Sequence, residues 1–118
     1  MSTAANVVIA IVALLHVSFM VLEMFLWTKP AGLRAFGRTP QQAEDSKVLA
    51  ANQGLYNGFL AAGLVWSLLL GPAGTQIKVF FLVCILIAGI YGAATASRKI
   101  LFVQALPAAI GLALVLVS

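Results

Sequence analysis

Charged and reactive side chains are scarce in this chain of 118 residues. Only 8% of the residues are charged, three of them acidic and seven Lys or Arg, while 63% are hydrophobic. A soluble domain has about a quarter charged residues, so this chain lacks the polar surface that a water-soluble fold needs. The single cysteine, Cys84, excludes an internal disulfide.

Motifs for metal, cofactor or nucleotide chemistry are also missing. With one histidine and one cysteine, the chain has no HExxH motif and no cysteine pair. His16 and Glu23 are about 10.5 Å apart along a helix, too far to share one ion easily. There is no glycine-rich phosphate loop and no serine nucleophile elbow, so we expect neither a metal nor a cofactor. The net charge is +4, but the basic residues lie at the ends of apolar runs. We therefore expect no nucleic-acid partner.

Four long apolar runs take up most of the chain. A helix needs about 20 mainly apolar residues to cross a bilayer. The qualifying segments are residues 7–27, 48–70, 77–97 and 100–117. The sequence therefore predicts an all-α fold, a single four-helix transmembrane domain over residues 1–118 with short loops. Four short helices enclose little interior, so we also expect a homodimer.

The basic residues predict the orientation, since short loops rich in Lys and Arg stay in the cytoplasm. Six basic residues lie in two of the connections, namely Lys29, Arg34, Arg38, Lys47, Arg98 and Lys99. The third connection has Lys78, and the N-terminus has no basic side chain. We expect both termini outside and the two basic loops inside.

The first basic loop has two recognisable parts. Residues 32–38 alternate apolar and basic side chains, which predicts an interfacial turn with Leu33 and Phe36 in lipid. Thr39, Pro40 and Gln42 then form the pattern of a helix start, with a capping box and proline at the first helical position.

Ionisable residues within a span mark functional sites by default. At 100° per residue, His16, Met20, Glu23 and Trp27 share one narrow face of the first span. Lipid offers Glu23 no partner, so this face should turn to the interior of the bundle.

The second span carries a matching polar arc. Asn52, Gln53, Tyr56 and Asn57 cover about 140° of its surface. Small residues run beside the arc at Ala50, Gly54, Gly58 and Ala62. Small-residue stripes let helices approach closely, so Gly54 and Gly58 are predicted to pack against a neighbouring helix.

The polar residues of the spans are predicted to lie at similar depths in the membrane. At 1.5 Å per residue, Glu23, Asn52 and Gln53 lie roughly 6–8 Å inside the cytoplasmic boundary, and Tyr91 and Gln104 roughly 6–10 Å inside. Asn57 and His16 are deeper. The sequence thus predicts a pocket open to the cytoplasm that holds a small polar or lipid-soluble ligand, lined by His16, Glu23, Asn52, Gln53, Tyr56, Asn57, Tyr91 and Gln104.

Structural readings of the same residues stay open. The amides of the second span are also typical of interhelical hydrogen bonds that serve packing alone. Glu23 lies near enough to the interface to reach Lys29 or Arg98, and His16 can be a neutral histidine bonded to a carbonyl.

Three sequence features together resemble a family of small bacterial four-span membrane proteins known as a domain of unknown function. They are His16, the run EMFLW from Glu23 to Trp27, and NQGLYNGF from Asn52 to Phe59. The resemblance covers essentially the whole chain and implies a multi-pass protein of the bacterial inner membrane. It implies no activity.

Three functions fit these residues. The first is binding or transport, in which Glu23 takes a proton or a cationic group. The second is a membrane-embedded enzyme, with His16 and Glu23 as acid and base towards a lipid-soluble substrate. The third is a structural subunit whose polar groups bond within a larger membrane complex.

Overall fold

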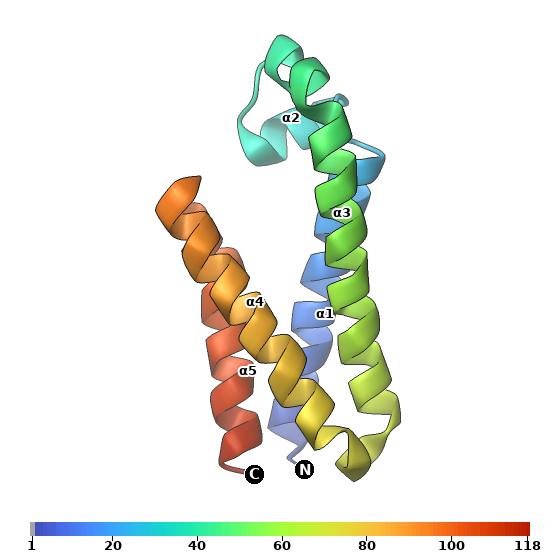
Figure 1. Cartoon of the computed structure of the whole chain (residues 1–118), viewed down its shortest axis with the longest axis vertical. Helices are drawn as coiled ribbons and strands as arrows, with labels where there is room; N and C mark the ends of the chain where they lie inside the picture. The colour runs from blue at the N-terminus through green and yellow to red at the C-terminus, as the bar shows by residue number, and fades with distance from the viewer. Residues whose placement is uncertain (1) are drawn as a thin grey trace. The chain divides into compact units, whose positions relative to one another are not determined.

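The computed structural model describes residues 2–118, and among these residues it is all helical, without a strand. Figure 1 shows the helices in chain order. They are α1 (Thr3–Met24), α2 (Pro30–Phe36), α3 (Pro40–Leu69), the 3₁₀ turn η1 (Gly71–Gly74), α4 (Thr75–Thr95), the π-helical turn η2 (Leu101–Ala105) and α5 (Leu106–Leu116). The predicted all-α class is confirmed.

Two helical segments of the described chain are long and apolar enough to cross a membrane, Thr3–Met24 and Gly71–Thr95. The apolar helix Leu101–Leu116 is shorter than a usual span. At 30 residues α3 is long enough, but polar side chains from Asn52 to Asn57 lower its hydropathy. A four-span bundle therefore stays a prediction.

The chain divides into two compact units, and α1 and α3 contribute to both. The first unit comprises the chain up to Leu14 together with Leu60–Ser118. The second unit is Leu15–Phe59. Each unit has a hydrophobic cluster of its own.

In the first unit, α4 packs along η2 and α5, as Figure 1 shows. Gly111 of α5 contacts this core closely, since a Cβ there would lie 3.4 Å from atoms of both Leu82 and Val8. The buried core residues are Ala5, Ile9, Val12, Ala13, Leu64, Leu82, Ile85, Ala108 and Val115. These residues are all Ala, Val, Ile or Leu, so the core forms by packing small and branched apolar side chains between the helices.

The turn η2 is wider than an α-helix and leads into Pro107. Proline has no N–H to donate to the carbonyl four residues earlier, and a π-helical turn directly before it fits that missing hydrogen bond. A proline within an apolar run predicts a kinked helix, but it does not by itself predict this wider turn. Gly89 of α4 lies against the turn, where an added Cβ would be 2.6 Å from the Ala105 backbone nitrogen.

We expect Gly89→Ala to destabilise the first unit by about 1–2 kcal/mol, because backbone atoms cannot make room for the methyl group. Gly92→Ala is the matched control on the same helix. A Cβ there would meet the Ile100 side chain at 3.1 Å, which can turn aside. Thermal unfolding in detergent measures the difference, and equal melting temperatures for the two variants would contradict this packing.

In the second unit, the start of α3 follows the pattern read from the sequence. The Thr39 backbone N–H donates to Gln42 Oε1 at 3.0 Å, and the Gln42 N–H donates to Thr39 Oγ1 at 3.2 Å. This reciprocal pair is a capping box, and α3 begins at Pro40.

The segment before it differs from the prediction. Pro30–Phe36 is a short helix, α2, ended by Gly37 in the left-handed conformation at φ 61°. Leu33 and Phe36 are half-buried and pack against a buried cluster of Trp27, Ala43 and Ala50. The sequence did not predict this contact with the start of α3. That Leu33 and Phe36 also dip into lipid stays a prediction.

Candidate functional site

A buried carboxylate and a buried amide meet in the second unit. Asn57 Nδ2 of α3 donates a hydrogen bond to Glu23 Oε1 of α1, with a distance of 2.5 Å between the two atoms. The exposed fractions are 9% for Glu23 and 6% for Asn57. Hydrogen bonds that an ionised carboxylate accepts are stronger than those between two neutral groups.

Glycines on α3 bring the two helices close enough for this contact. A Cβ on Gly54 would lie 2.7 Å from Met24 Cγ and 3.0 Å from Glu23 Cβ. A Cβ on Gly58 would lie 2.7 Å from Met20 Sδ. The missing side chains leave room for the methionines, and the backbone of α3 approaches α1.

The pairing of Glu23 with Asn57 differs from the depths counted along the sequence, which placed Glu23 level with Asn52 and Gln53. In a helix each Cα–Cβ bond tilts toward the N-terminus. The helices are antiparallel here, so the side chain of Glu23 leans toward Asn57 while that of Asn57 leans toward Glu23. Together the two tilts span an axial offset of about one helical turn between the residues. The depths counted along the sequence used Cα positions and did not include these tilts.

His16 lies seven residues before Glu23 on α1 and is fully buried. Its ring packs edge-on against Phe19, with 5.2 Å between the ring centroids. His16 thus belongs to the same unit as the Glu23–Asn57 pair.

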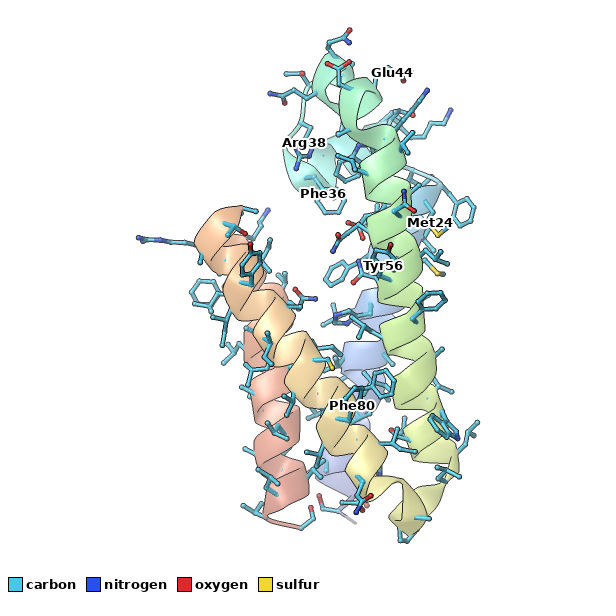
Figure 2. All side chains as sticks on the ribbon, in the orientation of Figure 1. Met24, Phe36, Arg38, Glu44, Tyr56 and Phe80 are labelled. Carbon is cyan, nitrogen blue, oxygen red and sulfur yellow. The ribbon has the colours of Figure 1, made fainter. Side chains whose placement is uncertain are left out.

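The remaining residues of the predicted arc are exposed. Asn52, Gln53 and Tyr56 are open on α3, and Figure 2 shows the position of Tyr56 on that helix. The Asn52 side-chain amide donates back to the Val48 carbonyl at 2.9 Å. Among the predicted residues of this helix, Asn57 alone is buried against α1.

Tyr91 and Gln104 belong to the first unit, where Tyr91 is exposed on α4 and Gln104 is half-buried in η2. The predicted gathering of all eight residues in one pocket therefore stays a prediction. Six of the eight lie together in the second unit.

An open groove of about 400 Å³ runs along the second unit where α1 ends. It combines the last turn of α1 and the turn after it with one side of α3. The groove is lined by Glu23, Met24, Phe25, Trp27, Thr28, Lys47, Val48, Ala51 and Asn52.

Trp27 lies on the predicted inward face of the first span, but its contacts, which hold the end of this unit together, were not predicted. Its Nε1 donates to Ser46 Oγ at 3.1 Å, and its ring centroid lies 4.8 Å from that of Phe36. The Arg38 guanidinium stacks 5.1 Å from the ring centroid of Trp27. Figure 2 shows Phe36 and Arg38 together at the end of α2. These partners come from α2, from α3 and from the connection between them, and they have no common periodicity, so no local pattern could reveal them.

Lys78 is a second residue whose place was not expected. The sequence assigned it to a loop, but it is fully buried in α4 and donates to Asn6 Oδ1 of α1 at 3.1 Å. Its position inside the apolar run 77–97 was the available signal.

The chain matches the model of a known family over residues 10–116, described as a protein of unknown function (DUF1304). It is also similar to "Uncharacterized protein YpaA" of Lactococcus lactis subsp. lactis (strain IL1403), with 32% identity over 96 residues, which cover 80% of this chain and 81% of that protein. No solved structure matches the chain. The helices and the buried pair described above are thus those of a member of the DUF1304 family, to which this chain belongs.

Proposed function

We propose that this chain is a multi-pass protein of the bacterial inner membrane that binds a proton or a cationic ligand at Glu23. The membrane location is supported by the two long apolar helices and by the charge bias of the loops. The short helix Leu101–Leu116 and the polar α3 are the remaining spans in this proposal.

The observation that carries the proposal is the buried Glu23–Asn57 pair. Among the described residues, Lys47 forms an ion pair with Glu44 on the surface and not with Glu23. Glu23 accepts a hydrogen bond from the neutral side-chain amide of Asn57. A carboxylate at this depth in lipid is costly unless a proton or a cation neutralises it. The amide of Asn57 fixes one oxygen of the carboxylate and leaves the other for the ligand.

A hydrophobic cation tests the proposal. We expect the purified protein in detergent to bind tetraphenylphosphonium, and Glu23→Gln to weaken the binding by about tenfold or more, since a charge-assisted contact contributes about 1.5–3 kcal/mol. Tetraphenylphosphonium has no hydrogen-bond donor, so the loss in Glu23→Gln reflects a bound cation left without a counter-charge. Isothermal titration calorimetry measures both dissociation constants. Glu44→Gln is the matched control, because Glu44 is half-exposed and paired with Lys47 on the surface.

Equal binding by Glu23→Gln and the unmodified protein would refute the ligand site. If Glu23→Gln instead lowers only the melting temperature, the pair serves packing, as in a structural subunit. Conversion of a lipid-soluble compound that is lost in both His16→Ala and Glu23→Gln would favour the enzyme.

The orientation has its own test. Ala35 is exposed on α2, so Cys at this position in a Cys84→Ser background should react with a membrane-impermeant maleimide only after the cells are opened. Labelling from outside intact cells would overturn the proposed orientation.

A further inference from the structure

The groove at the end of α1 has a chemical character that the Glu23–Asn57 pair does not use. We infer that it holds the head group of an amino-phospholipid, a lipid whose phosphate is joined to a primary ammonium group. Glu23 also lines the groove, but the inference rests on the membrane location in the proposed function and on the other lining residues.

The groove has one cationic side chain in its lining. Lys47 lines it, and the salt bridge from Lys47 to Glu44 joins two side chains that are each 54% exposed. An exposed pair of this kind contributes about 0–1 kcal/mol. A phosphate therefore replaces Glu44 as the partner of Lys47 at little cost.

The end of α1 offers hydrogen-bond acceptors. In the part of the chain that the structure describes, the backbone N–H groups of Phe25 and Leu26 both donate to the Val21 carbonyl. The next carbonyls of α1, those of Glu23 and Met24 among them, have no backbone donor there, and a helix C-terminus carries partial negative charge.

Asn52 adds an acceptor to the groove. Its Nδ2 is used by the Val48 carbonyl, which leaves its oxygen, and it lines the groove together with the Thr28 hydroxyl. Such acceptors repel a bare phosphate and suit an ammonium group, so the groove as a whole fits a zwitterion.

Part of the groove lining is apolar. Phe25 and Val48 line it, and their exposed fractions are 64% and 69%. In the proposed orientation both residues lie at the cytoplasmic boundary, beside Trp27. Acyl chains of a lipid from that leaflet would cover them, which a soluble zwitterion could not do.

Lipid choice tests this inference. We would titrate the Trp66→Phe variant, in which Trp27 is the remaining tryptophan, with short-chain phosphatidylethanolamine, phosphatidylcholine or phosphatidylglycerol and follow the fluorescence of Trp27. We expect phosphatidylethanolamine to bind about tenfold more tightly than the others, since choline cannot donate a hydrogen bond and glycerol carries no cation.

Lys47→Gln should remove most of that preference, whereas Lys29→Gln, an exposed lysine outside the groove lining, should not. Equal affinities for the three lipids, or equal effects of the two lysine variants, would overturn the inference. Inorganic phosphate or glycerophosphoethanolamine binding as tightly as the lipid would also overturn it, because the apolar part of the lining would then play no part. Tetraphenylphosphonium binding reports separately on Glu23, so either proposal can fail while the other stands.

Discussion

Replacing Trp27 with alanine is expected to destabilise the second unit by about 3–5 kcal/mol, the range for large buried aromatic side chains. The ring is 8% exposed and lies in the buried cluster with Ala43 and Ala50. The substitution also leaves the apolar face of α2 without its main contact, so α2 should detach from α3. Chemical unfolding in detergent, followed by circular dichroism, measures the loss.

Trp27→Phe and Ser46→Ala separate the causes. Trp27→Phe keeps an aromatic ring but loses the donor to Ser46. Ser46→Ala removes that acceptor together with the hydrogen bond from Ser46 Oγ to the Gln42 carbonyl. Both should cost about 1–2 kcal/mol, close to the value of one hydrogen bond and its small packing change. If Trp27→Ala were no worse than Ser46→Ala, α2 would not depend on the ring and the described cluster would be wrong.

Replacing Asn57 with leucine is expected to cost about 2–3 kcal/mol of stability, because the Glu23 carboxylate then stays buried without its donor. Asn52→Leu is the matched control on the same helix. Asn52 is exposed and bonds only to its own helix, and substitutions at such positions usually change stability by less than about 0.5 kcal/mol. Thermal unfolding of both variants in the same detergent measures the difference.

The double variant Glu23→Leu with Asn57→Leu completes a thermodynamic cycle. Removing both partners is far less costly than removing one, so the double variant should be more stable than the sum of the two single effects. Strict additivity of the two single variants would show that Glu23 and Asn57 do not interact.

Local signals predicted the features that depend on neighbours in the sequence. The start of α3 at Pro40 follows from Thr39 and Gln42, which bond to each other three residues apart. The shared face of His16 and Glu23 follows from a seven-residue spacing. These inferences need only the geometry of one helix.

Features that depend on two or more helices could not be read in this way. The helical period placed Gln53, Tyr56 and Asn57 on one arc, but it cannot say which part of the arc faces α1. The close approach at Gly54 and Gly58 fixes the contact, and Asn57 falls inside it while Gln53 and Tyr56 do not.

The packing of the α2 segment also could not be predicted from its own sequence. Its alternating pattern of apolar and basic residues fits a membrane interface as well as a protein surface. The structure adds a contact that the pattern does not predict, because Leu33 and Phe36 pack against the cluster around Trp27. That contact comes from the fold-back of the chain, which no short pattern encodes.

The most direct test of the account is the pH dependence of tetraphenylphosphonium binding. Protons and the cation compete for the Glu23 carboxylate, so the affinity of the unmodified protein should fall as the pH is lowered. In Glu23→Gln the affinity should be weak and independent of pH. The same pH dependence in both proteins would contradict the claim that Glu23 is the binding group.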